Sequence, residues 1–267
     1  MKRSTRYSNA KRVLIILISL LSLALAVWQL PWFRVRQIER PQLRSITDDE
    51  LTAAIQPYKG QHLFSGLGGS LDHLFQLRYR KMEEQLAAQY PVIETVSASL
   101  RFPYGISLSI AERVEIAYVA IPDGSVMIDK QGVAMFIWPR TPADIPVIEG
   151  IHVMSLSLGQ PLNVDVPDAL NSALTLMGAI IDADKDERLD LKLLPQIRRI
   201  RPIGGRQLYL SVELPGTGEI LTVLAKTGHE QVEDMAWLRF ALEQSVLENR
   251  DKGVLDMTGE RITFRPD

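Results

Sequence analysis

The sequence predicts an α+β protein that is held in a membrane by a single N-terminal helix. Three observations support this fold class. An uncharged apolar run extends from Val13 to Leu30, a strand-helix-helix-strand-strand pattern follows up to Glu112, and the rest of the chain is rich in strands with two helical patterns. The chain has 267 residues, so enough remains beyond the apolar run for two small domains with cores of their own.

The apolar run is long enough for a transmembrane helix. As a helix it would extend about 27 Å at ~1.5 Å per residue, close to the ~30 Å hydrocarbon core of a bilayer. Only basic charges precede it, which predicts a cytoplasmic tail at 1–12, a helix at 13–33 and an extracytoplasmic remainder. A signal peptide cleaved after Ala26 is the alternative. We favour an anchor that contacts membrane lipid and crosses the inner membrane once, because apolar residues continue to Leu30.

The first block after the run combines strands and helices. The expected strands are 35–43, 92–100 and 106–110. A short helix should begin at a capping box made by Thr47 and Glu50, and should end before Pro57. Apolar residues at three- and four-residue spacing predict a second, longer helix over 71–87.

The block after Glu112 predicts a sheet with helices packed on it. The expected strands are 115–121, 126–128, 133–138, 147–148, 197–203, 207–212 and 220–225. Helical periodicity covers 168–181 and 231–249. A last strand or strand pair is expected at 254–257 and 261–265.

Composition excludes several classes of function. Thirty Lys and Arg against 32 Asp and Glu give a net charge of −2, so no overall field attracts nucleic acid. The chain has no cysteine, which rules out disulfides, thiolate catalysis and cysteine-based metal sites.

The strongest candidate for a metal site is the acidic run Asp182–Asp190. Its alternate Asp residues could supply oxygen ligands to Ca²⁺, as in the first half of an EF-hand loop. An EF-hand loop also needs a glycine at its sixth position and a bidentate glutamate at its twelfth. The residues at these positions, counted from Asp182, are Glu187 and Leu193. We therefore expect a solvated acidic loop without a metal.

No catalytic or cofactor-binding residue is predicted. The histidines at 62, 73, 152 and 229 show no metal-binding spacing, so surface or capping roles are expected for them. Gly66–Gly69 precedes a helix but lacks the Lys-Ser/Thr of a phosphate-binding loop. No serine-nucleophile motif is present. Glu112 and Arg113 are expected to form an exposed ion pair, with a domain junction or a partner contact as the alternatives.

Several short motifs resemble the FtsQ/DivIB family of bacterial cell-division proteins. They follow the family's order over nearly the whole chain: Phe33–Ile38, Thr47–Leu51, Gly60–Phe64, Tyr90–Ile93, Leu100–Arg113, Met127–Val133, Ile145–Gly150 and Val254–Met257. Two features depart from the family pattern. The insert Ser65–Ser70 is longer than usual, and Thr258–Glu260 lacks the aromatic residue often found in the family's final partner-binding strand.

The resemblance implies a POTRA domain at 34–112, a β domain at 113–253 and a C-terminal strand region at 254–267. It also implies a non-enzymatic divisome scaffold at the division septum, which acts in septal cell-wall synthesis through protein contacts. The implied partners are single-span coiled-coil proteins of the FtsB/DivIC and FtsL types, with a septal peptidoglycan synthase as a further partner. Two alternatives stay open: a POTRA-containing component of membrane protein export or assembly, and an exported cell-wall enzyme.

The end of the chain is the predicted partner-binding surface. A strand at a sheet edge presents unpaired backbone groups, to which a partner segment can add as a further strand. The candidate residues are Val254, Leu255, Met257, Ile262, Phe264 and Arg265. Leu255 and Met257 are individually expected to close the hydrophobic core.

Overall fold

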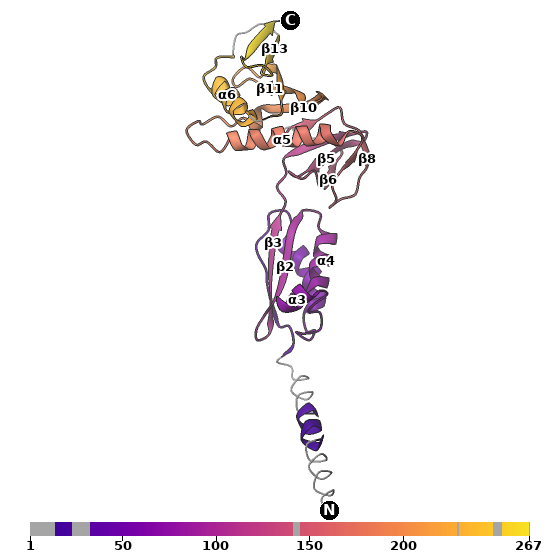
Figure 1. The fold of residues 1–267 in the computed structure, drawn as a ribbon. Coiled ribbons are helices and arrows are strands. Elements are labelled where there is room, and N and C mark those ends of the chain that lie inside the picture. Colours follow the sequence, from indigo (N-terminus) through magenta and orange to yellow (C-terminus); the bar gives the residue numbers. More distant parts are fainter. Residues whose placement is uncertain (1–13, 23–32, 141–144, 229, 248–252, 267) are drawn as a thin grey trace, which may run out of the picture. The chain divides into compact units, whose positions relative to one another are not determined.

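A computed structural model describes residues 14–22, 33–140, 145–228, 230–247 and 253–266 (Figure 1). The expected tail at 1–12 lies outside these residues, as do residue 13 and residues 23–32 of the expected anchor; residues 14–22 are helical. Within the described ranges, no helix is both long and apolar enough to cross a membrane. The chain divides into two compact units, 1–112 and 113–267, which we describe separately.

Unit 1 has the predicted order of strand, helices, strand and strand. Its elements are β1 (Gln37–Glu39), α2 (Asp48–Ile55), a 3-10 turn (Gln56–Tyr58), α3 (Leu71–Phe75), α4 (Arg80–Gln89), β2 (Ile93–Arg101) and β3 (Gly105–Glu112). The sheet order is β1-β3-β2, with β1 parallel and β2 antiparallel to β3. α4 packs against β2, and Leu51, Leu86 and Ile106 are buried in the core of this unit.

α2 begins at the predicted capping box. The Glu50 backbone N–H donates to the Thr47 hydroxyl at 3.3 Å, and the Thr47 N–H donates to the Glu50 carboxylate at 2.8 Å. These two bonds satisfy donors that a helix start leaves without an intrahelical partner. The strand predicted at 35–43 is shorter than expected, because only Gln37–Glu39 pair with β3.

The single helix predicted over 71–87 is instead two helices, α3 and α4. Leu77, between them, has a left-handed backbone with φ 54°. The chain there runs along β2: Leu100 N–H donates to the Leu77 carbonyl at 2.8 Å, and Tyr79 N–H donates to the Ala98 carbonyl at 2.8 Å. Pairing with a strand thus satisfies backbone groups that a continuous helix would have paired internally. Leu71 and Phe75, which the periodicity placed in the core, are 74% and 84% exposed.

Unit 2 is built on one nine-stranded sheet. The strands of this sheet are β4 (Ala117–Ile121), β5 (Gly124–Ile128), β6 (Ala134–Trp138), β7 (Val147–Ile148), β10 (Ile197–Gly204), β11 (Gln207–Glu213), β12 (Ile220–Lys226), β13 (Gly253–Asp256) and β14 (Thr263–Pro266). Their spatial order is β14-β13-β12-β11-β10-β7-β4-β5-β6. β7 pairs in parallel with both β4 and β10, and β12 pairs in parallel with β13.

Two helices and a small hairpin complete unit 2. The helices are α5 (Pro167–Ala183) and α6 (Gln231–Glu243), a 3-10 turn spans Leu194–Gln196, and the hairpin pairs β8 (Val153–Ser155) with β9 (Asn163–Val164). α5 and α6 pack against each other (Figure 1). Their apolar side chains share one core with alternate residues of the sheet. α6 is the crossover that parallel pairing of β12 with β13 requires. It ends at Glu243, six residues before the predicted end, and residues 248–252 lie outside the described ranges.

Candidate interaction surface

The predicted partner-binding residues lie at one end of the nine-stranded sheet. β13 and β14 form an antiparallel pair in which Val254 faces Arg265, Leu255 faces Phe264, and Asp256 faces Thr263. β14 is the last strand of the sheet in the described part of the chain. The sequence prediction of a terminal strand pair is therefore confirmed, and the pair occupies a sheet edge.

Alternation along the two strands divides the six candidate residues into two groups. Leu255 and Met257 are 3% and 1% exposed and belong to the hydrophobic core. Ile262 and Phe264 are partly buried and pack against the same core. The expectation that Leu255 and Met257 close the core is confirmed. Val254 and Arg265 lie on the other face of the pair, because successive side chains of a strand point to opposite faces.

Asp256 makes several polar contacts on the outward face of this strand pair. Its carboxylate accepts hydrogen bonds from the Thr258 backbone N–H at 2.9 Å and from the Thr258 hydroxyl at 2.7 Å, and it also pairs with Arg265. The Thr258 hydroxyl and N–H, followed by the Arg265 charge, hold the pKa of Asp256 below its ordinary value. The Lys226 ammonium donates to the Thr258 carbonyl and ties this turn to β12. The turn between β13 and β14 is therefore fixed by polar contacts.

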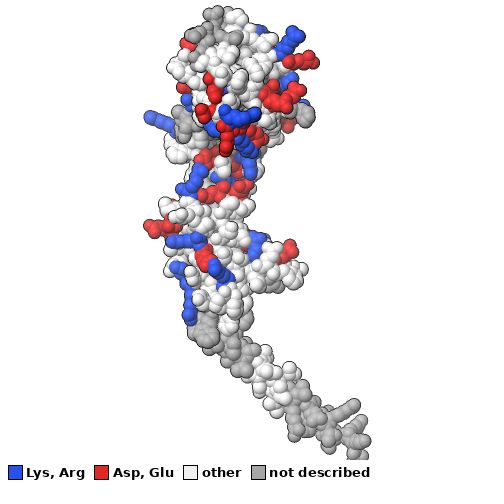
Figure 2. All heavy atoms as spheres, turned by 90° about the vertical axis from the view of Figure 1, so that its left-hand side faces the viewer, with Lys and Arg blue, Asp and Glu red and all other residues white. Residues whose placement is uncertain are grey.

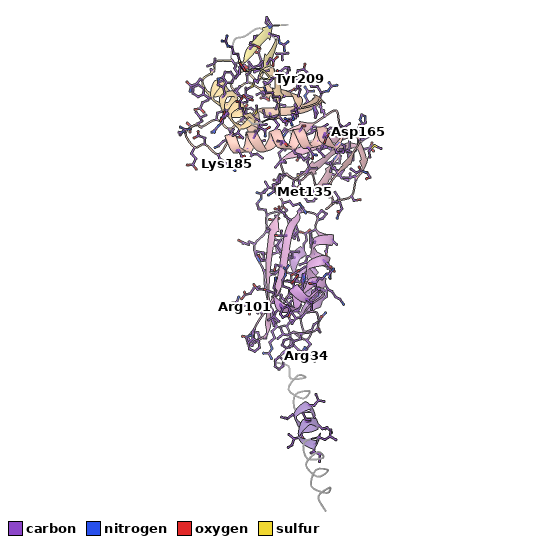
Figure 3. All side chains as sticks on the ribbon, viewed as in Figure 1. Arg34, Arg101, Met135, Asp165, Lys185 and Tyr209 are labelled. Atoms are coloured by element: carbon purple, nitrogen blue, oxygen red, sulfur yellow. The ribbon has the colours of Figure 1, made fainter. Side chains whose placement is uncertain are left out.

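The acidic run Asp182–Asp190 surrounds a buried arginine, which the sequence analysis did not identify. Arg239 of α6 is 0% exposed. Its guanidinium donates to four carbonyl oxygens at 2.6–2.9 Å, those of Ala183, Asp186, Leu189 and Leu191. Lys185, labelled in Figure 3, belongs to the same loop and pairs with Asp182 at 2.7 Å. The run thus forms a loop that closes around the guanidinium of Arg239.

The carboxylates of this run have separate partners. Asp184 accepts hydrogen bonds from the backbone N–H groups of Leu193 and Leu194 at 2.7 and 2.8 Å, and its oxygen lies 3.4 Å from the Arg239 guanidinium. Asp186 pairs with Arg188, and these bonds hold the pKa of Asp186 below its ordinary value. Over the described residues, no group of three or more His, Asp or Glu side chains could hold a metal ion.

The remaining singled-out residues have local structural partners. His73 contacts Ser70 and the buried Glu83, and His152 lies 3.3 Å from Asp165. His62 stacks on the ring of Phe33 and contacts the ring of Phe64 in a tilted arrangement. His229 lies outside the described residues. The Ser70 hydroxyl accepts a hydrogen bond from the His73 N–H at 3.2 Å, so this serine caps the helix after the glycine-rich insert.

Glu112 and Arg113 each have a partner in their own unit. The Glu112 carboxylate accepts hydrogen bonds from the backbone N–H groups of Arg44 and Ser45 at 2.6 and 2.7 Å. Arg113 donates to Asp129 at 2.6 Å, and Asp129 is almost completely buried. Glu112 and Arg113 thus each make an anchoring contact, one in each unit, and the expected ion pair between them stays a prediction.

Fold and surface together define a two-unit α+β chain in which β14 is the outermost strand on one side of the larger sheet, within the described residues. Figure 2 shows positive and negative side chains intermixed on the visible face, without a large region of one sign. No protein-family model and no curated protein matches the sequence.

Among solved structures, the chain is similar to the major extracytoplasmic domain of the cell-division protein DivIB from Geobacillus stearothermophilus, in its trans isomer. The match has a TM-score of 0.31 and 16% sequence identity, and it covers 53% of this chain and 99% of that chain. DivIB is a member of the family that the sequence motifs resemble. The function proposed below rests on the residues of this chain.

Proposed function

We propose that this protein is a membrane-anchored scaffold of the bacterial divisome that binds other division proteins during septal cell-wall synthesis. The observation that carries the proposal is the outermost position of β14 in the nine-stranded sheet. The motifs that resemble the FtsQ/DivIB family, from Phe33–Ile38 to Val254–Met257, support cell division as the process in which this chain acts. A scaffold acts by binding, so this function needs no catalytic group.

Partner binding is proposed to occur by strand addition to β14. An extended partner segment would gain main-chain hydrogen bonds along Thr263–Pro266, and alternate side chains would set specificity. Val254 and Arg265 are the candidate residues on the outward face, whereas Leu255 and Met257 support the edge from the core. The proposed partners are the single-span coiled-coil proteins of the FtsB/DivIC and FtsL types.

The proposal assigns a role to each part of the chain. Segment 34–112 would be a POTRA domain, 113–253 a β domain, and 254–267 the partner-binding strand region. The helix expected at 13–33 would anchor the chain in the inner membrane, with both units outside the cytoplasm at the septum. This arrangement places β14 on the side of the membrane where cell-wall synthesis occurs.

The proposal is tested by changing β14 in the full-length chain, reconstituted with purified FtsB/DivIC-type and FtsL-type proteins of the same organism. Deletion of Arg261–Asp267 should abolish co-purification of the partners. Thr263→Lys, which places a long charged side chain on the exposed edge, should weaken binding at least tenfold, because such charges block strand addition. Ile220→Lys is the matched control, since Ile220 is also exposed but begins β12 in the interior of the sheet.

Cooperative unfolding and an unchanged tryptophan fluorescence spectrum would show that each variant is folded. Partner binding that survives both β14 changes in a folded protein would refute strand addition at this edge.

A further inference from the structure

The exposed apolar side chains of unit 1 gather in two segments of the chain. Within the described part of 33–112, the strongly exposed large apolar or aromatic residues are Leu71, Phe75, Leu77, Phe102 and Tyr104. The first three belong to α3 and the residues just after it, and the last two to the turn between β2 and β3. The two segments meet where the Leu100 N–H donates to the Leu77 carbonyl at 2.8 Å, two residues before Phe102.

The turn between β2 and β3 lies beside the point where the chain enters unit 1. The Arg36 N–H donates to the Tyr104 carbonyl at 2.9 Å, and the guanidinium carbon of Arg36 lies 5.8 Å from the centre of the Tyr104 ring. β1 then pairs in parallel with β3 from its first residue, with Gln37 opposite Gly105. The exposed aromatic residues of the turn therefore flank the segment that follows the predicted anchor.

The length of this segment limits how far the turn can lie from a bilayer. The predicted anchor ends at residue 33, and an extended chain spans at most ~3.6 Å per residue, so the Arg36 backbone lies within about 11 Å of the anchor's end. Val35 is buried, and its N–H donates to the Gln61 carbonyl at 2.9 Å, so this connection is fixed to unit 1. The headgroup layer adds roughly 5–8 Å outside the hydrocarbon core. The side chains of Phe102 and Tyr104 are therefore within reach of that layer.

The side chains at this end match a membrane surface in their chemistry. Rings with a polar end, such as that of Tyr104, concentrate at membrane–water interfaces, and Phe and Leu side chains enter the outer acyl region. Arg34 and Arg36 are exposed on the connection, where their charged ends can reach lipid phosphates while their methylene groups cover apolar surface. Arg34 and Arg101, both labelled in Figure 3, lie in the half of unit 1 where the chain enters it.

The predicted anchor also explains why a small apolar surface is sufficient here. A protein that binds from solution needs an interface of about 1,200 Å² or more to form a stable complex. A unit that is already tethered to the membrane contacts the lipid intramolecularly, at an effective concentration in the millimolar range for a short connection. A weak contact with lipid can therefore orient unit 1, whereas a surface of this size would not retain a soluble partner.

We propose that Leu77, Phe102 and Tyr104 form a lipid-contacting surface, which lies against the headgroup and outer acyl region of the membrane and fixes the orientation of unit 1 on it. This inference rests on the anchor in the proposed function. It does not depend on partner binding at β14, which involves the other unit.

The test measures contact between single labelled positions and lipid. The chain has no cysteine, so Phe102→Cys, Gln89→Cys and Leu17→Cys each give one site for an environment-sensitive fluorophore. Each full-length variant is reconstituted in lipid nanodiscs that contain nitroxide lipids. Gln89 is the matched control, because it is exposed at the end of α4 and precedes β2, whereas Phe102 follows β2. The nine residues of β2 separate the two positions by roughly 26 Å.

A nitroxide near the headgroup should lower the emission of the Phe102 label at least twofold and leave the Gln89 label nearly unchanged. Tyr104→Asp should reduce the quenching at Phe102 by at least half, because a carboxylate resists transfer out of water. Gln89→Asp should not reduce it. Cooperative unfolding followed by circular dichroism would show that the variants are folded.

The label at Leu17, within the predicted anchor, separates failure of this inference from failure of the anchor. Quenching of Leu17 by a nitroxide deep in the acyl chains, with equal or no quenching at Phe102 and Gln89, would retain the anchor and overturn the lipid-contacting surface. Absence of quenching at Leu17 would reject the anchor and this inference with it. A Phe102 label that is shielded from water but not quenched by lipid would also overturn it, since a second copy would then cover the turn.

Discussion

At the residue scale, Arg239 shows how a charged side chain can act as a core residue. A fully buried cation is costly unless its donors are all satisfied. Here four carbonyl oxygens and the Asp184 carboxylate surround the guanidinium. No sequence pattern indicates this arrangement, because an arginine on an amphipathic helix is usually exposed.

Replacement of Arg239 should therefore strongly destabilise unit 2. Arg239→Met removes the shared donor and leaves buried carbonyl groups without partners, for an expected loss of about 3–5 kcal/mol in the free energy of unfolding. Arg239→Lys should not restore stability, because an ammonium cannot reproduce the planar fork of donors. Urea unfolding of the full-length chain, followed by far-UV circular dichroism, measures both. Arg188→Met is the control, since Arg188 is exposed, and an equal loss there would contradict the assignment.

The pH dependence of stability should depend on the contact between Thr258 and Asp256. The pKa of Asp256 is lowered in the folded state, chiefly by the Thr258 hydroxyl. A lowered pKa means that this contact stabilises the fold above the ordinary carboxyl pKa and loses its effect as pH falls through the folded-state pKa. Thr258→Val should therefore destabilise the protein near neutral pH, and the difference from wild type should shrink on acidification. Thr222→Val, on neighbouring β12, should show a difference that does not vary with pH.

At the element scale, local signals were reliable where local chemistry determines structure. The capping box of Thr47 and Glu50 and the strand pair at the end of the chain could be predicted because their partners are close in sequence. The break between α3 and α4 could not, because it depends on pairing with β2, about twenty residues further along. The periodicity over 231–249 predicts an apolar helix face that includes Val232, Met235 and Leu238. Met235 and Leu238 are buried, but Val232 is exposed near the start of α6.

The break at Leu77 can be tested by a pair of substitutions with opposite expectations. At a left-handed position, glycine is more stable than alanine by about 1 kcal/mol, whereas within a helix alanine is more stable by a similar amount. Leu77→Gly should therefore be more stable than Leu77→Ala in urea unfolding. Both variants lose the same packing, so the sign of the difference reports on the backbone alone. A more stable alanine variant would indicate a continuous helix.

At the scale of the whole molecule, the sheet order depends on contacts that no local pattern reveals. β7 has only two residues, yet it lies between β4 and β10 and joins the two halves of the nine-stranded sheet. The strand pair that holds the candidate residues was predictable, because apolar and polar residues alternate at 254–257 and 261–265. The division of the six candidate residues between core and outward face became clear only from the register. The exposure of Phe136, Ile137 and Trp138 on β6 was not predicted, because these apolar residues fit a buried strand equally well.

The two units should separate under limited proteolysis. Glu112 is held within unit 1 and Arg113 within unit 2, and Val114 after them is 63% exposed. Brief trypsin or elastase treatment should cut near 113–116 or in the glycine-rich insert Ser65–Ser70. Fragment masses and N-terminal sequencing would locate the cuts. Early cuts inside α4 or β11 would contradict the division into two compact units.

The topology prediction concerns the whole chain, because the proposed septal role needs unit 2, which holds β14, outside the cytoplasm. The basic tail before Val13 should remain inside, since positively charged flanks resist translocation. A protease added to intact spheroplasts should therefore degrade the segment from Arg34 onward and leave a short membrane-embedded fragment. An antibody tag at the N-terminus should remain with that fragment, and a tag at the C-terminus should be lost. Full protection of the C-terminal tag would place both units in the cytoplasm, and a mature chain starting at Val27 would replace the anchor by a cleaved signal peptide.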